Sequence, residues 1–387
     1  MAGAPERSAD VLELTPRATP SIRMVYLSPV LALVLTVVLC AALFTLLGQS
    51  AARGLALFFV EPFSSTRALG ELSLRATPLL LIGVGLALAF RANVWNVGAE
   101  GQLIIGALCA ARVALAASES TGRGVVIAIL SAGALGGMAW AAVVAALRDR
   151  FGASEILVSL MLVYVAEQLL GYLVFGPWRD PAGHNFPQTR LFTDAARIPR
   201  LVSGSRADVG LLVALVAAGG AWLFSERTRA GFALQIGGAA PLAARHAGYS
   251  ARGALWLACL LSGGLAGLAG ALEVAGPLGQ LTPHLPAGHG FTAIIVAFVG
   301  RCSPLGAIFA SFLLSLFHIG GELAQSRLAL PKSITMVFEG LLLFSLLASD
   351  TLIYRRLRWS RSPLPARSGA APMAAPHASR AARGEQR

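Results

Sequence analysis

The sequence predicts an all-α polytopic membrane protein of about ten transmembrane helices, and two observations support that prediction. Charged residues make up 13% of the 387 residues and hydrophobic residues 56%, whereas a soluble domain carries about 25% charged residues. Uncharged apolar windows also recur, and most approach the roughly 20 residues that a helix needs to cross a bilayer core. These windows are Met24–Ala52, Ala76–Phe90, Gly124–Leu147, Val209–Ser225, Gly253–Leu272 and Cys302–Gly321.

The positions of the arginines predict the direction of each span. Basic residues collect in cytoplasmic loops, which predicts that both termini are cytoplasmic. Five arginines in the predicted outside loop, residues 176–208, oppose this pattern, so the inverted topology remains an alternative. After a first span that ends near Leu47, the predicted spans are Ala76–Phe90, Asn96–Ala116, Gly124–Leu147, Ile156–Phe175, Val209–Phe224, Gly253–Val274, His289–Gly300, Cys302–Ile319 and Ser333–Leu347.

Three regions follow from this pattern. Residues 1–24 are predicted as a cytoplasmic N-terminal tail and residues 25–350 as the transmembrane domain, which includes a basic cytoplasmic loop at 225–252. Residues 351–387 are rich in Ala, Pro, Ser and Arg, a composition that predicts a disordered basic tail. The stretch Leu55–Phe63 is too short to span, which predicts an interfacial or half-buried segment.

Several function classes are disfavoured by what the sequence lacks. The net charge of +12 is explained by basic cytoplasmic loops, so no nucleic-acid partner is expected. No metal-ligand spacing or catalytic motif occurs, and we expect no metal, no cofactor and no enzyme activity. Lys332 is the only lysine, in the context LALPKS, and a P-loop needs a lysine after its glycines. If ATP drives this protein, another subunit binds the ATP.

Small residues in the seventh span predict close helix packing. Gly263, Gly267, Ala271 and Ala275 repeat every four residues, and Ser262, Ala266 and Gly270 form a second stripe beside them. Helices in lipid associate through small residues that let their backbones approach. We therefore expect this helix to pack on two sides, with Gly263, Gly267 and Gly270 at the contacts.

The stretch FRANVWNVGAEGQLIIG, Phe90–Gly106, places polar residues directly between two apolar runs. Charged groups at bilayer depth cost several kcal/mol and persist where they face protein or water. A glycine-bearing helix start can be broken or re-entrant. Two interpretations remain open: Glu100 caps the helix while Asn96 satisfies backbone groups, or these residues line a pathway. Carboxylates in other spans keep a proton-driven transporter as an alternative, namely Glu167, Glu273, Glu322 and Glu339.

The basic loop contains a candidate docking segment. Pro241 suits the first turn of a helix, which predicts a short helix Leu242–Ala247 with a stop at Gly248. Such a helix could transmit motion from a soluble partner, and an ordinary surface turn is the alternative.

The polar stretch Phe90–Gly106 resembles the signature of permease subunits of bacterial ABC importers, in the branched-chain amino acid and simple-sugar permease family. It is most similar to the nucleoside-uptake branch. The resemblance continues in the family's order and covers most of residues 25–350. Its further blocks are Glu155–Thr189, Pro241–Val274, Gly288–Leu313 and Pro331–Phe344.

The resemblance implies a type II ABC importer fold in the bacterial inner membrane. Two permease chains would face each other across the solute path, the second one being a paralogue. ABC ATPase subunits would dock beneath, and a periplasmic or lipoprotein solute-binding protein would deliver nucleosides from above. Simple sugars and branched-chain amino acids are the alternative solutes. The ATPase coupling segment corresponds to Ala240, Pro241, Leu242, Ala243, Ala244, Arg245, His246, Ala247 and Gly248.

The resemblance also suggests residues of the translocation pathway. This sequence departs from the family's pattern at three places. Relatives often carry Asn-Pro-Arg at 240–242, Phe-Asp-Gly at 291–293 and glutamine at Glu339. Trp95 and Phe291 could stack on a flat solute or could be ordinary membrane aromatics. The candidate pathway residues are Trp95, Asn96, Glu100, Gln102, Phe291 and Thr292.

Overall fold

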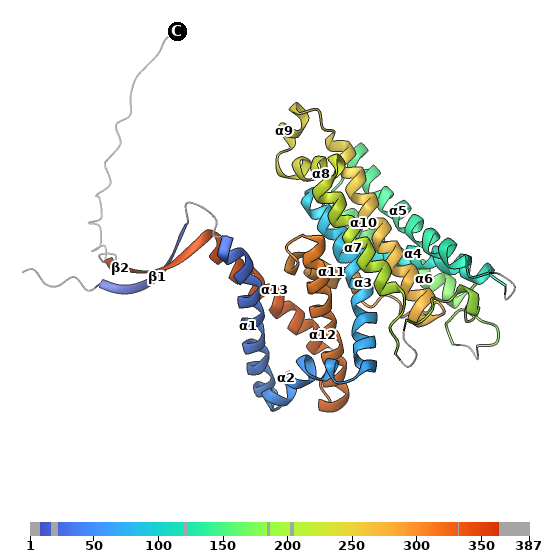
Figure 1. Cartoon of the computed structure of the whole chain (residues 1–387), viewed down its shortest axis with the longest axis horizontal. Helices are drawn as coiled ribbons and strands as arrows, with labels where there is room; N and C mark the ends of the chain where they lie inside the picture. Colours follow the sequence, from blue (N-terminus) through green and yellow to red (C-terminus); the bar gives the residue numbers. More distant parts are fainter. Residues whose placement is uncertain are drawn as a thin grey trace, which may run out of the picture. The chain divides into compact units, whose positions relative to one another are not determined.

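The structure is a computed structural model that describes residues 8–16, 22–118, 122–183, 186–201, 205–331 and 333–363 (Figure 1). Its elements in chain order are β1 (Ser8–Pro16), α1 (Ile22–Leu46), α2 (Ala51–Phe59), η1 (Glu61–Phe63), α3 (Thr66–Arg91), α4 (Ala99–Ala116), α5 (Val125–Phe151), α6 (Glu155–Phe175), η2 (Asp194–Ala196), α7 (Gly210–Arg227), α8 (Arg229–Ala239), α9 (Pro241–His246), α10 (Ala251–Glu273), η3 (Val274–Leu278), α11 (His289–Val299), α12 (Pro304–Leu328), α13 (Ser333–Tyr354) and β2 (Arg355–Pro363).

The chain divides into two compact units, Met1–Ser28 with Ala348–Arg387, and Pro29–Leu347. In the first unit β1 and β2 pair antiparallel, from Ser8 opposite Pro363 to Pro16 opposite Arg355. The sequence does not predict this strand pair. Residues 355–363 form a strand in the region predicted as a disordered tail, and residues 364–387 of that region lie outside the described residues.

Within the described residues, nine helices are long and apolar enough to cross a membrane, and α11 is a shorter apolar helix. Together they account for the ten segments that the sequence predicts. The predicted span His289–Gly300 is the exception in length. Its helix, α11, has 11 residues and is therefore about 16 Å long at 1.5 Å per residue. That is about half of a bilayer core.

α3 is the central helix of the second unit. Its most apolar window is 94% buried inside the protein, whereas those of α1 and α6 are only 22% buried. Because α3 is apolar all round and enclosed, it belongs to the core, while α1 and α6 leave apolar faces for lipid. α10 lies beside α3 and also packs against α4 and α5.

A phenylalanine cluster joins α1, α2, α12 and α13. The ring centroids of Phe44 and Phe338 are 5.3 Å apart, and those of Phe58 and Phe338 are 4.8 Å apart. Such tilted and edge-on pairs stabilise a core beyond their area alone. The segment predicted as interfacial or half-buried, Leu55–Phe63, forms the end of α2 and all of η1. It contributes Phe58 to this cluster.

α8 and α9 lie together at one end of the bundle, which we call the α9 end (Figure 1). Arg91, at the end of α3, pairs there with Glu226 of α7 at 2.9 Å and donates to the Cys302 carbonyl at 2.7 Å. Arg252, at the start of α10, pairs with Asp149 of α5 at 2.6 Å. The opposite end carries η1, the start of α3 and the end of α12.

Candidate functional site

The polar stretch forms a break between α3 and α4. Residues 92–98 are not helical. The Asn96 amide donates to Ser262 Oγ at 2.9 Å, and Ser262 follows Ala251, the first residue of α10, by 11 residues. At 1.5 Å per residue this contact lies about 16 Å along α10. α4 therefore begins inside the apolar layer, as expected of a broken helix start.

Two buried amides hold this break in place. Asn96 Nδ2 donates to Gln102 Oε1 at 2.9 Å, and Gln102 Nε2 donates back to Asn96 Oδ1 at 3.0 Å. The Gly98 N–H also donates to Asn96 Oδ1, at 3.2 Å. Non-helical backbone is tolerated at membrane depth where it is enclosed by protein. Asn96 and Gln102 stabilise this non-helical backbone, because their amides bond each other and Asn96 also accepts from the Gly98 N–H.

Glu100 caps a different helix from the one that contains it. Its side chain, in the first turn of α4, is buried. It accepts hydrogen bonds from the Gly288 N–H at 3.0 Å and from the Gly290 N–H. Both donors belong to the N-terminus of α11. A carboxylate is favourable there because it satisfies free N–H groups and opposes the positive end of the helix dipole.

The starts of α4 and α11 therefore meet at about the same depth. α11 ends at a turn that Arg91 holds at the α9 end through the Cys302 carbonyl. Its N-terminus is about 16 Å from that turn, which agrees with the depth of Ser262 along α10. Gly290 permits the approach, because a Cβ there would lie 2.7 Å from Cα of Glu100.

The other candidate pathway residues divide into exposed and buried side chains. Trp95 is 40% exposed and lies against Phe90 and Phe298, with ring centroids 5.2 Å and 6.1 Å away. Phe291 is also 40% exposed. Thr292 is buried and donates to Glu339 Oε2 at 3.3 Å.

Glu339 has a basic partner, and that partner comes from another helix. His318 Nε2 of α12 lies 3.2 Å from Glu339 Oε1 of α13. The His318 ring also meets the His289 ring of α11 edge-on, with centroids 6.2 Å apart. These polar side chains link α11, α12 and α13. Ionisable groups within spans are functional candidates because burying them is costly.

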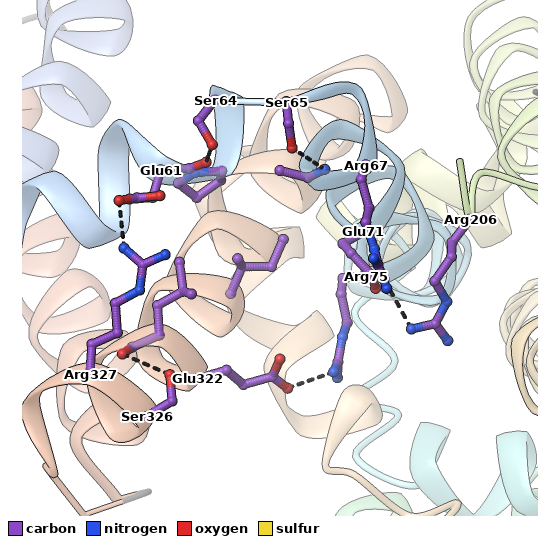
Figure 2. Close-up of a pocket in the computed structure, with 14 residues that line it drawn as sticks. Glu61, Ser64, Ser65, Arg67, Glu71, Arg75, Arg206, Glu322, Ser326 and Arg327 are labelled. Atoms are coloured by element: carbon purple, nitrogen blue, oxygen red, sulfur yellow. Dashed lines mark hydrogen bonds and ion pairs between the residues drawn. The ribbon is translucent and has the colours of Figure 1, made fainter. Parts of the chain in front are cut away.

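A cavity of about 630 Å³ opens at the end of the bundle opposite α9. It lies between η1, α3 and α12, with Arg206 from the loop that precedes α7. Figure 2 shows that oppositely charged side chains reach toward one another across this cavity, which we call the charged cavity. The ion pairs are Arg327–Glu61 at 2.6 Å, Arg206–Glu71 at 3.0 Å and Arg75–Glu322 at 2.5 Å.

A second cavity of about 190 Å³, which we call the inner cavity, shares Glu71, Arg75 and Arg206 with the first. It extends to Glu273 of α10 and to His289, the first residue of α11. The two cavities thus lead from the end of the bundle toward the depth where α11 begins. None of the six candidate pathway residues lines either cavity.

The sequence indicates Glu273 and Glu322 only as carboxylates in or beside spans, and the predicted pathway residues include neither Arg75 nor His289. Two signals could have found this region. Arg75 directly precedes a long apolar run, and a charge there marks a functional candidate. Pro277 has no N–H for the Glu273 carbonyl four residues earlier. The helix opens there into the π-turn η3, a feature that occurs frequently at functional sites.

Both small-residue stripes of α10 make close contacts. A Cβ added at Gly267 would lie 2.8 Å from Cα of Gly137 on α5. Gly263 also faces Gly137, and a Cβ at Gly270 would lie 3.0 Å from the Ala107 nitrogen on α4. The glycines therefore permit backbone contact with two neighbouring helices.

The loop before α7 forms a strap along the segment that joins α10 to α11. The Phe192 N–H donates to the Gly279 carbonyl at 2.8 Å, and the Ile198 N–H donates to the Ala275 carbonyl at 2.9 Å. Asp208, at the end of this loop, accepts from the Gly210 N–H at 2.9 Å. Burial raises the pKa of the Asp208 carboxyl, and this hydrogen bond opposes part of the rise.

Some of the loop arginines that oppose the positive-inside pattern have structural partners. Arg190 donates to the Leu115 carbonyl in the last turn of α4. The Arg197 guanidinium lies next to Gly279, which ends the π-turn after α10. Cations are favourable at helix C-termini because carbonyls there have no helical partners. These two arginines therefore lie at the C-terminal ends of helices, where a positive charge is favourable.

The basic loop contains a short helix, α9 (Pro241–His246), where the sequence predicts a helix Leu242–Ala247. Pro241 lies in its first turn, and Gly248 has a φ of +80° just beyond it. Leu242 is 74% exposed, while Ala244 is buried. A cavity of about 440 Å³ adjoins α9 and is lined by Arg245, Gly248, Tyr249, Ser250, Ala251 and Arg252. The α9 end therefore presents an apolar side chain beside a basic recess.

Residues 68–347 match the family described as the permease component of branched-chain amino acid transport systems. A glucose ABC transporter permease protein of Haloferax volcanii is 33% identical over 357 residues, which cover 90% of this chain and 93% of that protein. A guanosine ABC transporter permease protein of Bacillus subtilis is 29% identical over 333 residues, covering 84% of this chain and 93% of that protein. A nucleoside ABC transporter permease protein of Lactococcus lactis is 25% identical over 326 residues, with coverage of 82% and 89%.

No solved structure matches this chain. The family match includes every span from α3 to α12 and most of α13. Together with the nine apolar helices, it identifies a multi-pass membrane protein. The chain belongs to the family of branched-chain amino acid transport permease components and is a permease subunit of an ABC importer.

Proposed function

We propose that this permease carries nucleosides or closely related neutral, polyhydroxylated solutes. The observation that supports this most directly is the charge balance of the two connected cavities. Arg75, Arg206 and Arg327 each pair with a carboxylate at 3.0 Å or less. The remaining charged side chains of the two linings, Arg67 and Glu273, carry opposite charges, so the two linings together favour a neutral polar solute over an anion.

The solutes named for the relatives share one chemical feature. Guanosine and glucose both carry hydroxyl groups on adjacent carbons, and both are uncharged at neutral pH. A polar cavity that offers carboxylate acceptors and guanidinium donors suits such groups. We favour nucleosides over sugars as the solute because two of the three relatives described above are named for guanosine or nucleosides.

We place the α9 end in the cytoplasm, because Arg91, Arg148 and Arg252 lie there. ABC ATPase subunits would dock against α9, and the binding protein would deliver solute to the charged cavity at the opposite end. A second permease chain, a paralogue, would complete the path. We also place both termini in the cytoplasm, because arginines precede the first span and follow the last.

Below the inner cavity, we propose that solute passes the exposed faces of Trp95 and Phe291. Thr292 lies beside this route on α11. Asn96, Glu100 and Gln102 hold the backbone of the break and the start of α11 in position along it. This assignment rests on their hydrogen bonds and on the shared depth of the two helix starts.

The transport assay uses proteoliposomes that contain the permease pair, the ATPase subunits and the binding protein. We expect uptake of radiolabelled guanosine that requires ATP and persists when a protonophore collapses the proton gradient. The buried His318–Glu339 pair is the feature that would suit a proton-driven carrier. Uptake that stops with the protonophore at constant ATP would favour that second function and contradict the proposal.

The coupling role of α9 gives a prediction of its own. Leu242→Glu is expected to reduce ATP-dependent uptake of solute at least about tenfold. A charge would replace the exposed apolar side chain that would be buried against the ATPase. Leu242→Met keeps an apolar side chain and should retain uptake. ATP hydrolysis and uptake are measured together. Full uptake by the Leu242→Glu complex would exclude α9 from the docking surface.

A further inference from the structure

Glu273 stands apart from the other carboxylates of the two cavities. Glu71 and Glu322 each accept a hydrogen bond from an arginine. In the described part of the chain, the Glu273 carboxylate has no hydrogen bond and no ion pair, although it lines the inner cavity. A carboxylate at this depth is costly unless it has donors. Its position suggests that the donors come from a ligand.

His289 provides a second, independent observation on the same cavity. It is 4% exposed, and its Nδ1 is buried without a hydrogen-bond partner. Buried polar atoms are nearly always paired, so each exception calls for an explanation. His289 lines the inner cavity together with Glu273. A carboxylate without a hydrogen-bond partner and a buried histidine from a different helix therefore line one small cavity.

The charges around the cavity limit the ligand. Arg75 and Arg206 line the same space, and each is already paired with a carboxylate. An anion is disfavoured by the unpaired carboxylate of Glu273. A neutral ligand with two adjacent hydroxyl groups avoids this penalty, because each hydroxyl donates one hydrogen to a carboxylate oxygen.

The volumes indicate which part of the ligand enters. Small-molecule pockets usually measure about 300–1,000 Å³. The inner cavity, at about 190 Å³, is below that range, whereas the adjoining charged cavity, at about 630 Å³, is within it. The inner cavity is thus suited to the hydroxyl-bearing ring of a solute, with the rest of the molecule in the charged cavity.

We propose that Glu273 and His289 form a solute subsite that recognises the vicinal diol of a ribonucleoside, with the Glu273 carboxylate accepting from both hydroxyl groups and the His289 side chain lining the same cavity. The subsite rests on the function proposed above. Its geometry also depends on Pro277, whose π-turn follows Glu273 directly.

The test compares guanosine with 2′-deoxyguanosine, which lacks one hydroxyl of the diol, in the complete reconstituted importer. The affinity of the binding protein for each solute is measured separately, so that the preference of the binding protein can be separated from that of the permease. Wild-type transporter should retain a residual preference for guanosine. Glu273→Gln should lower kcat/KM for guanosine about tenfold, because a hydrogen bond to a charged group is replaced by a weaker one. Uptake of the deoxy compound should change less.

Glu167→Gln is the matched control, since Glu167 is a carboxylate on the neighbouring span α6 that lines neither cavity. It should keep the wild-type preference. If Glu273→Gln fails to assemble, Glu273→Asp is measured in the same way; its carboxylate lies one methylene farther from the solute, and a loss of preference in the same direction is expected.

The outcomes separate the subsite from the function. If wild type takes up guanosine with ATP but Glu273→Gln keeps its full preference for guanosine, the subsite is wrong and the proposed function stands. If wild type takes up no guanosine, the proposed function is wrong, and the diol subsite falls with it.

Discussion

Replacing Gly267 with leucine is expected to prevent the bundle from assembling. A Cβ at this position would lie 2.8 Å from Cα of Gly137 and closer still to the carbonyl oxygen of Gly133, both on α5. These neighbours are backbone atoms, which cannot rotate away. Overpacking alone costs about 1–3 kcal/mol, and a backbone clash moves two helices apart. We expect a loss of monodisperse protein in detergent, or a fall of at least about 5 °C in thermal midpoint.

The matched control is Gly219→Leu on α7, because a Cβ at Gly219 would meet no atom within 4 Å. Both variants add the same apolar side chain to a glycine in a span. The control should elute and melt as wild type does. Equal stability of the two variants would show that close approach of α10 to α5 does not hold the fold together.

Glu100→Gln carries the second large effect. Its carboxylate accepts from the Gly288 and Gly290 N–H groups, and glutamine would turn one acceptor oxygen into an N–H₂ donor that faces a donor. Hydrogen bonds to a charged group contribute about 1.5–3 kcal/mol each, so we expect a loss of about 2–4 kcal/mol at the start of α11. Hydrogen exchange at residues 288–292 should rise, and transport should fall with it.

Glu167→Gln again serves as control, since it removes a carboxylate that acts on Glu100 only through its charge and makes no hydrogen bond to α11. The two interpretations left open by the sequence predict different outcomes here. A residue that only contacts passing solute would lower uptake and leave exchange near α11 unchanged. That result would contradict the capping role described above.

The sequence predicts the spans and the close packing because both depend on local patterns. Apolar length predicts the helices, and a four-residue glycine repeat predicts the contacts of α10. α9 was predictable because Pro241 and Gly248 act within a few residues of themselves. The half-length of α11 was harder to predict, because its apolar composition is that of a full span and only its surroundings show where it begins.

The candidate site was less predictable because its contacts join distant parts of the chain. Glu100 and Gly290 are 190 residues apart, and Arg75 and Glu322 are 247 apart. No periodicity reports such pairs. The glycines and polar residues of the stretch allow a broken helix start, but the partners of Asn96 and Glu100 depend on how α10 and α11 fold back beside it. The two cavities arise only from that arrangement.

α10 joins the proposed docking helix to the proposed solute subsite. It begins five residues after α9 ends and runs for 23 residues to Glu273, so it forms a single rod of about 34 Å. If the ATPase subunits dock against α9 as proposed, a displacement of α9 would move this rod as one rigid body. Movement at the docking helix would then reach the inner cavity without a relay of side chains.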